Sequence, residues 1–417
     1  MVEPGADAGR EPRNAGWLFI GFYALAMIGA WMTILTPLIV TLPLRIHRIS
    51  PDNEGAALSL VLGVGAVVAM AASVVAGRLS DRTVSPWGRR RPWMIGGAVG
   101  GVVGIAIVAM APSVGLLLVG WCLVQLSVNA ALAGLTAVLP DQVPEHQRGW
   151  ISGVLGMSLP VGQVLGTFLA QALSPNLPAM FVAPPVAALA LIAAFACVAP
   201  DHRPTPAQSP SEPLLHWIKA FWIDPRRAPD FAWAWASRFL FMLGLAFLLN
   251  YQAFFLIHHI KAAESEVPRI IFLSALLSSG LVCVASLVGG KLSDLLRRRK
   301  AFVAMAAAAY ALSLWGIAAS GSVESYLVAF AIAGLGQGLY LGVDMALVTD
   351  VLPDRETDAA KNLGVFNMAS ALPQTIAPAI APAILFLGRG DYAVLFAAAG
   401  AFAAAGALAV LPISKVR

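Results

Sequence analysis

Charged side chains are scarce in this chain of 417 residues. Only 12% of the residues are Asp, Glu, Lys or Arg, whereas 59% are hydrophobic, and the mean hydropathy is +0.79. Charged residues make up about a quarter of a soluble domain, so this composition excludes an ordinary soluble protein. The sequence predicts a protein of the lipid bilayer.

Cysteine is scarce as well. Cys122, Cys197 and Cys283 are odd in number, lie in apolar segments and form no C-x-x-C pair, which argues against a disulfide framework or a metal site. No G-x-x-x-x-G-K-[ST] phosphate loop is present, and no nucleophile, acid and base converge by spacing. We therefore expect no cofactor, no metal and no enzyme activity.

Long apolar segments are abundant. Crossing about 30 Å of hydrocarbon takes about 20 apolar residues in a helix, and the sequence offers twelve such segments. They are 17–45, 57–77, 93–112, 114–139, 149–173, 179–199, 231–257, 267–290, 301–320, 324–351, 362–387 and 392–413.

Basic residues follow the topology of these spans. With the amino terminus placed inside, 21 of the 27 Lys and Arg residues fall on the inner side, five on the outer side, and Arg238 within a span. This positive-inside pattern predicts a multi-pass protein of the cell membrane with both termini cytoplasmic. It also explains the net charge of +5 without any nucleic-acid partner.

The two halves of the chain repeat one another. Leu79-Ser80-Asp81 recurs as Leu292-Ser293-Asp294, and the same offset relates Pro140-Asp141 to Pro353-Asp354 and Pro160 to Pro373. We expect an all-α integral membrane fold of twelve transmembrane helices in two pseudo-repeated lobes, 1–199 and 231–417, each of six helices. Such a duplication suits alternating access around a central site.

A proline-rich polar segment, 200–230, separates the two halves and is interpreted as a cytoplasmic linker. Within it, 214–222 has helical spacing of apolar and basic residues. This spacing fits a short helix on the membrane interface, and equally a helix that bridges the lobes.

The loop after the second span carries the most specific motif, which reads G-R-L-S-D-R-T-V-S-P-W-G-R-R-R-P-W from Gly77 to Trp93. It resembles the cytoplasmic loop signature of the major facilitator superfamily. The five residues between Asp81-Arg82 and Gly88 resemble, more narrowly, the sucrose/proton and the glycoside-pentoside-hexuronide:cation symporters. The segment from Gly364 to Gln374 is similar to span 11 of the sucrose symporters.

This resemblance implies a cytoplasmic gate. In the family picture Asp81 faces the start of span 11 near Asn362, and Asp294 faces the start of span 5 near Gly149, each carboxylate lying against the positive end of a helix. Alternatively, the arginines only anchor the topology. The residues expected in the gate are Asp81, Arg82, Gly88, Arg89, Arg90, Arg91 and Asp294.

Two ionisable residues lie deep within predicted spans. Asp344 in span 10 and Arg238 in span 7 both lie roughly 10–12 Å from the cytoplasmic end at 1.5 Å per residue, so they could pair. An ionisable group at this depth is a functional candidate by default. We expect Asp344 to bind and release a coupling proton beside Arg238; the alternatives are a structural salt bridge and snorkelling of Arg238.

Amides and aromatic rings cluster in the same spans. Gln337, Tyr340 and Asp344 share one face of span 10, and Gln125 and Asn129 share one face of span 4. The resemblance places spans 1, 4, 7 and 10 around the central pathway, where uncharged hydrogen-bonding groups suit a neutral polyol such as a sugar or glycoside. The expected cavity residues are Trp31, Gln125, Asn129, Asn250, Tyr251, Gln337, Tyr340, Asn367 and Gln374.

Other interpretations stay open. The melibiose-type relatives carry acids in span 2, and the absence of acids from 57–77 favours protons over sodium as the coupling ion.

Leu159-Pro160-Val161-Gly162 keeps the proline of a span-5 motif of antiporters. Proton-coupled efflux of a hydrophobic or cationic compound is therefore the alternative function, followed by a non-transporting membrane sensor. His258-His259 could sense external pH or simply lie at the interface. We expect a monomer whose partners are a small-molecule substrate, protons and lipid.

Overall fold

The computed structural model describes residues 15–200, 226, 228–351 and 359–414. Within these residues twelve helical segments are long and apolar enough to cross a membrane, which confirms the all-α fold with twelve spans. The predicted interfacial helix at 214–222, and with it most of the linker, lies outside the described residues.

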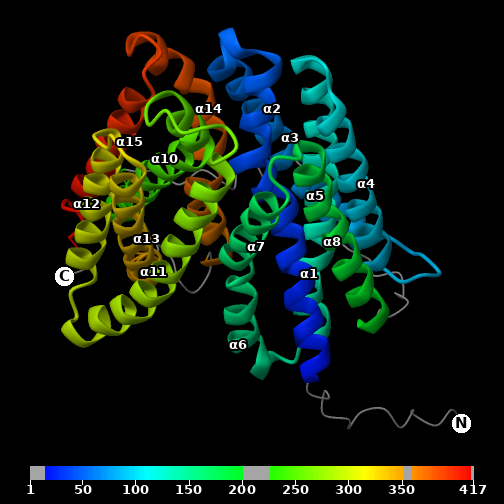
Figure 1. Cartoon of the computed structure of the whole chain (residues 1–417). Coiled ribbons are helices and arrows are strands. Elements are labelled where there is room, and N and C mark those ends of the chain that lie inside the picture. Colours follow the sequence, from blue (N-terminus) through cyan, green and yellow to red (C-terminus); the bar gives the residue numbers. More distant parts are fainter. Residues whose placement is uncertain (1–14, 201–225, 227, 352–358, 415–417) are drawn as a thin grey trace, which may run out of the picture.

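The helices divide between two lobes, which Figure 1 shows as a blue-to-green group beside a green-to-red group. The first lobe comprises α1 (Trp17–Thr36), η1 (Pro37–Thr41), α2 (Leu42–Ile49), η2 (Pro51–Asn53), α3 (Glu54–Arg82), α4 (Arg91–Met110), α5 (Val114–Gln142), α6 (Glu145–Gly156), α7 (Ser158–Ala172) and α8 (Leu177–Val198). The second comprises α10 (Pro229–His258), α11 (Val267–Leu296), α12 (Arg299–Ala318), α13 (Val323–Val351), α14 (Ala359–Leu387) and α15 (Tyr392–Ala409).

Prolines interrupt two spans of the first lobe. A proline has no N–H to donate, and its ring clashes with the carbonyl four residues earlier. At Pro37 the first span therefore widens into the π-helical turn η1 and then continues as α2. Near Pro160 the fifth span breaks between Gly156 and Ser158. Its repeat partner Pro373 lies inside α14, which stays continuous.

Helix packing repeats between the lobes. In the first lobe α4 packs on α5, α3 on α5, α1 on α8, and α1 on α7. The second lobe repeats these pairs as α12 on α13, α11 on α13, α10 on α15, and α10 on α14. The lobes themselves meet through α3 with α14 and α7 with α11, so the contact between them is pseudo-symmetric too.

Glycines let helix backbones touch inside each lobe. On α13, Gly334, Gly338 and Gly342 recur every four residues, and a Cβ on any of them would crowd the backbone atoms of α11. Without a hydrophobic driving force between helices in lipid, such close approach is a main source of helix association.

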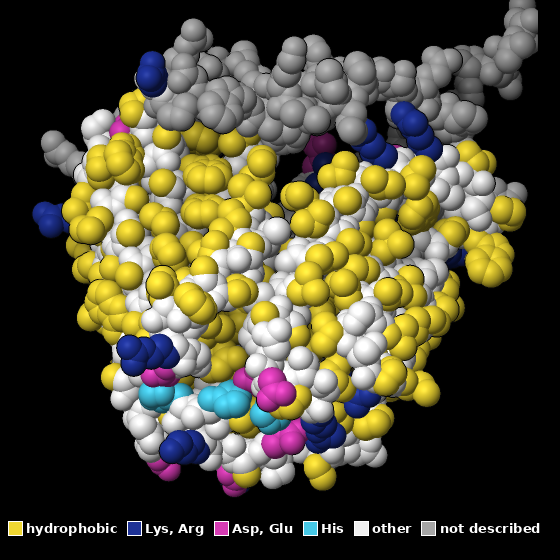
Figure 2. Space-filling view, turned by 90° about the horizontal axis from the view of Figure 1, so that it is seen from above, with side chains coloured by type: hydrophobic (Ala, Val, Ile, Leu, Met, Phe, Trp, Pro, Cys, Tyr) yellow, Lys and Arg dark blue, Asp and Glu magenta, His cyan; other side chains and the backbone are white. Residues whose placement is uncertain are grey.

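The outer surface has the character expected of a membrane protein. In Figure 2 hydrophobic side chains cover the middle of the face, while Lys, Arg, Asp, Glu and His gather at its two ends. We call one end the histidine end, because it carries His47, His258 and His259. We call the other the motif end, because it carries the loops after Asp81 and Asp294.

The described ends of the chain both lie at the motif end. The Ala15 amide donates to Gln147 Oε1 near the start of α6, and the Ser414 amide donates to Asp230 Oδ1 at the start of α10. An even number of spans requires this arrangement.

A pair of adjacent glycines in α4 tests this packing. A Cβ at Gly97 would clash with the Ser127 carbonyl oxygen, whereas a Cβ at Gly96 would meet nothing within 4 Å. We expect Gly97→Ala to destabilise the protein by about 1–3 kcal/mol through overpacking, and Gly96→Ala to be neutral or slightly stabilising. Thermal unfolding in detergent measures both; equal unfolding temperatures for the two variants would contradict the packing of α4 on α5.

Candidate functional site

The two deep charges predicted from sequence form an ion pair. Arg238 Nη1 on α10 lies 2.7 Å from Asp344 Oδ2 on α13, and their side chains are 11% and 3% exposed. A buried charge without a partner is strongly unfavourable, and the pair relieves this cost for both groups. The pair thereby joins α10 to α13 inside the second lobe.

Helix α14 completes the surroundings of the guanidinium. Arg238 Nε donates to Ser370 Oγ at 2.6 Å, and the guanidinium carbon lies 4.5 Å from the centroid of the Phe366 ring. The face of an aromatic ring attracts a cation, most strongly where water is excluded. Three helices therefore converge on one arginine, and a change in its charge balance acts on all three.

Two hydroxyl groups accompany the carboxylate. Tyr340 stacks on Phe241 with ring centroids 3.9 Å apart, which holds its hydroxyl beside Asp344 and Ser237. Among the described residues, the hydroxyls of Tyr340 and Ser237 have no hydrogen-bond partner of good geometry. They can therefore accept from or donate to the carboxyl group when its protonation changes.

The predicted cavity face of α13 is buried in this conformation. Tyr340 is 0% and Asp344 2% exposed, and only Gln337, one turn away, is half-buried. This face is therefore closed to solvent in the structure, and its place along a substrate pathway stays a prediction. Two contacts cover the face: Phe241, a residue of α10, stacks on Tyr340, and Ser370 of α14 binds Arg238 beside Asp344.

The other predicted cavity residues fall into two groups. Asn250 and Tyr251 are buried, and the Tyr251 hydroxyl shares a 2.7 Å hydrogen bond with Ser59 of the opposite lobe. Gln125 is buried, and its backbone carbonyl oxygen accepts from Asn129 Nδ2 at 2.8 Å. The half-buried or exposed members are Trp31, Asn129, Gln337, Asn367 and Gln374. Among the contacts that the structure describes, none joins Trp31, Gln337, Asn367 and Gln374 to one another.

Arginines of the first motif bind carboxylates of their own lobe. Arg89 and Arg90 each place an Nη2 atom 2.8 Å from Asp81 Oδ1, and Arg90 also reaches Asp141 Oδ2 at 2.9 Å. Arg91 donates to the Ala199 carbonyl oxygen at 2.7 Å, whereas Arg82 is exposed. Gly88 has φ +104°, a left-handed conformation that suits glycine, and it turns the chain toward these arginines.

The second motif repeats this arrangement with a shift in register. Arg299 contacts Asp294 Oδ1 at 3.1 Å and Asp350 Oδ2 at 2.5 Å, as Arg90 contacts Asp81 and Asp141. The constant sequence offset predicts Asp354 as the counterpart of Asp141. Asp354 lies outside the described residues, and among the described ones Arg299 pairs with Asp350. Arg90 follows Asp81 by nine residues, whereas Arg299 follows Asp294 by five, so the first loop is four residues longer. This difference moves the counterpart of Asp141 from position 354 to position 350.

Asp81 and Asp294 do not make the expected contacts with the other lobe. The polar contacts described for both carboxylates lie within their own lobe, rather than at the starts of α14 or α6. Figure 2 shows the surface hollowed between the lobes beside the grey residues, at the motif end. The contacts of Asp81 and Asp294 with the other lobe therefore stay a prediction, since the described residues show these carboxylates paired within their own lobes.

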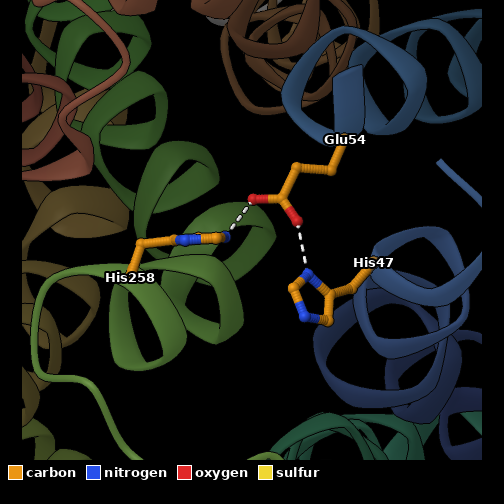
Figure 3. A group of neighbouring side chains, drawn as sticks. All are labelled: His47, Glu54 and His258. Carbon is orange, nitrogen blue, oxygen red and sulfur yellow. Dashed lines mark hydrogen bonds and ion pairs between the residues drawn. The ribbon is translucent and has the colours of Figure 1, made fainter. Parts of the chain in front are cut away.

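The lobes are joined at the histidine end instead. Arg48 contacts Glu264 at 2.7 Å, and Ser174 Oγ donates to the Ser265 carbonyl oxygen at 3.3 Å. Glu54 at the start of α3 contacts His47 of its own lobe at 2.7 Å and reaches across to His258 and, at 3.1 Å, to the Tyr392 hydroxyl. Figure 3 shows Glu54 between the two histidines.

Sequence reasoning missed this cluster and part of the arginine site. Glu54 was not singled out, although it follows His47 by seven residues across a loop on the same predicted side as His258. Phe366 and Ser370 lie within the segment that resembles the symporters, but the sequence pattern points only to the amides of that segment, Asn367 and Gln374, as site residues. A search for acids and histidines in loops of one side would have found the cluster.

The buried pair makes a stability prediction. Asp344→Ala leaves Arg238 buried without its partner, and we expect a loss of about 3–5 kcal/mol. The double variant Arg238→Met/Asp344→Leu removes both charges and should recover most of that loss. Thermal unfolding in detergent compares them; a single variant as stable as the parent protein would show that the pair is solvated rather than buried.

Comparison with known proteins agrees with this architecture. A family model described as Major Facilitator Superfamily matches residues 18–282 and 258–416. No curated relative matches the sequence. Three similar solved structures share the fold. A bacterial homolog of the human lysosomal transporter Spinster, inward-facing and unoccupied, has 15% identity and TM-score 0.69, with 94% of this chain and 97% of that chain covered.

The other two are a nucleoside transporter and a peptide transporter. A mutant of the nucleoside transporter NupG has 12% identity and TM-score 0.74, covering 95% of this chain and 99% of that chain. A mutant of the peptide transporter POT in complex with alafosfalin has 16% identity and TM-score 0.71, covering 95% and 92%. Since the family match spans nearly the whole length and the fold agrees, this chain belongs to the major facilitator superfamily.

Proposed function

We propose that this transporter moves a neutral polar solute, a sugar or glycoside, together with protons by alternating access. The observation that carries the proposal is the buried pair of Arg238 and Asp344, which binds three helices of one lobe through a group that can be protonated. The resemblance of the motif loop and of 364–374 to sugar symporters supports the substrate class.

Protonation of Asp344 would change the balance at this site. An ionised carboxylate neutralises Arg238, whereas a protonated one still accepts a hydrogen bond but leaves the guanidinium, which also contacts Ser370, Phe366 and Met345, without a counter-charge. A buried uncompensated charge costs several kcal/mol. Proton binding therefore favours a conformation in which Arg238 gains water or another partner, and this difference couples protons to movement.

The driving force is sufficient for accumulation. One charge moving through 100 mV gains about 2.3 kcal/mol, so a force near 150 mV supports roughly 300-fold accumulation at one proton per solute. Because Asp344 lies within the chain, a single copy can carry out this coupling, and we propose a functional monomer.

The orientation follows from charge. The excess of Lys and Arg at the motif end supports an orientation in which that end and both termini face the cytoplasm, in the cell membrane. The structure, joined at the histidine end, then corresponds to an inward-facing conformation. One similar structure is also described as inward-facing.

The available polar groups support an uncharged substrate. Apart from the paired Arg238 and Asp344, the candidate residues in the spans are amides and aromatic rings, which bind hydroxyl groups and stack on sugar rings. The similar structures named for peptides and nucleosides are 12–16% identical, so they support solute transport without choosing a substrate.

Proton coupling is tested with Asp344→Asn in liposomes. The amide keeps an acceptor for Arg238 but cannot release a proton, so we expect sugar counterflow to continue while gradient-driven accumulation is lost. Glu324→Gln is the matched control, since Glu324 lies on the same helix and is exposed. It should accumulate sugar normally.

The outcomes separate the candidates. Accumulation by Asp344→Asn at the parent level would contradict the coupling role. No uptake of any mono- or disaccharide by the parent protein, with extrusion of amphipathic compounds instead, would replace sugar symport by proton-coupled efflux.

Asp81 provides a second test. In the outward-facing conformation we propose that it contacts the start of α14, so Asp81→Asn should weaken that conformation and slow transport several-fold, in line with helix-terminus energies of about 0.3–1 kcal/mol or somewhat more when buried. Initial rates of counterflow measure the effect, with Asp52→Asn, an exposed acid at the histidine end, as control. Unchanged rates for Asp81→Asn would leave the loop only a topological role.

A further inference from the structure

Three metal-ligating side chains from both lobes meet at the histidine end. His47 lies near the end of the first span, Glu54 begins α3, and His258 ends α10 in the opposite lobe (Figure 3). One nitrogen or oxygen atom from each lies within 4.8 Å of the others. The proposed proton coupling at Asp344 uses none of these side chains.

The donor set suits a transition metal. Two imidazoles and a carboxylate are ligands of Zn²⁺, which binds such atoms at about 2.0–2.2 Å and leaves a fourth position for water. Imidazole nitrogens favour Zn²⁺, Cu²⁺ and Ni²⁺ over Mg²⁺ and Ca²⁺. In the structure His47 Nδ1 and His258 Nε2 both point at the Glu54 carboxylate, on different oxygens.

The surroundings orient the ligands and leave them reachable. The Tyr392 hydroxyl donates to Glu54 Oε1 at 3.1 Å, and the Tyr392 ring stacks against His258 with centroids 5.6 Å apart. Such outer contacts fix ligand geometry and raise metal affinity. Glu54 is 7% exposed, whereas His258 is 42% exposed, so an ion from solution can enter from the His258 side.

We propose that His47, Glu54 and His258 form a binding site for Zn²⁺ or a similar divalent transition metal, complete only when the lobes are closed at the histidine end. Two ligands belong to one lobe and one to the other, so opening this end separates them. A ligand that binds one conformation alone shifts the equilibrium toward it by a factor of one plus its concentration over Kd, about 100-fold at 100 times Kd. Metal binding therefore holds the transporter in the conformation seen here and inhibits transport.

Protons compete with the metal at these atoms. Each histidine must be neutral to act as a ligand. In the structure both imidazoles contact the Glu54 carboxylate directly. The neighbouring contacts of His259 with Asp391 and of Arg48 with Glu264 are separate and do not supply the three ligand atoms.

The test is calorimetric titration of the purified, tag-free full chain with Zn²⁺ in detergent, without substrate. We expect one ion per chain, and a loss of affinity of at least about tenfold in His47→Ala, His258→Ala and Glu54→Gln. His259→Ala is the matched control, because His259 neighbours His258 but stacks on Phe255 and pairs with Asp391. It should bind like the parent protein.

A second measurement addresses the closed conformation. Zn²⁺ should raise the unfolding temperature of the parent protein and of His259→Ala but not of His258→Ala, whose monodispersity confirms folding. If His258→Ala misfolds, His258→Gln replaces it. Unaltered affinity in both His258 variants, or no saturable binding by the parent, overturns the site. The binding assay involves neither sugar nor proton gradient, so its outcome is independent of whether the proposed symport is correct.

Discussion

A charge buried among apolar helices must have a partner, and this constraint determines the chemistry of the second lobe. Arg238 meets it with one carboxylate, one hydroxyl and one aromatic face, taken from α13 and α14. The same contacts that neutralise the arginine also hold three helices together. Removing the charge of Asp344 would therefore affect the packing of a lobe as well as the charge of a residue.

The pseudo-symmetric frame explains how such a local change can reach the whole molecule. Both lobes use the same helix pairs, and both tie the second and fourth spans through one arginine and two aspartates. Each lobe is thus stiffened at the motif end by its own ion network. The lobes contact one another elsewhere, where Glu54, Arg48 and Tyr251 bind their partners in the opposite lobe.

Much of the fold was predictable because the bilayer imposes it. The need for about 20 apolar residues per crossing located all twelve spans, and equal depth anticipated the Arg238 and Asp344 pair. Local rules were less successful. The widening at Pro37 and the break before Pro160 were not anticipated, since proline within a membrane helix can either interrupt it, as here, or leave it continuous, as at Pro373.

The contacts between helices could not be predicted from the periodicity of the sequence. Spacing placed Tyr340 and Asp344 on one face, but whether that face meets water or another helix depends on Phe241 and α14. The cluster of His47, Glu54 and His258 depends on the approach of two lobes, which no local pattern encodes. The gate residues show the same limit, because the motif predicts contacts between lobes, whereas the described contacts of Asp81 and Asp294 lie within their own lobes.

Infrared difference spectroscopy of the reconstituted protein would test the role of Asp344 most directly. A protonated carboxyl group has its own C=O stretching band, and titration should reveal such a band that is absent from Asp344→Asn and that changes when sugar binds. A spectrum in which no band depends on Asp344 across the pH range of transport would contradict proton binding at this site.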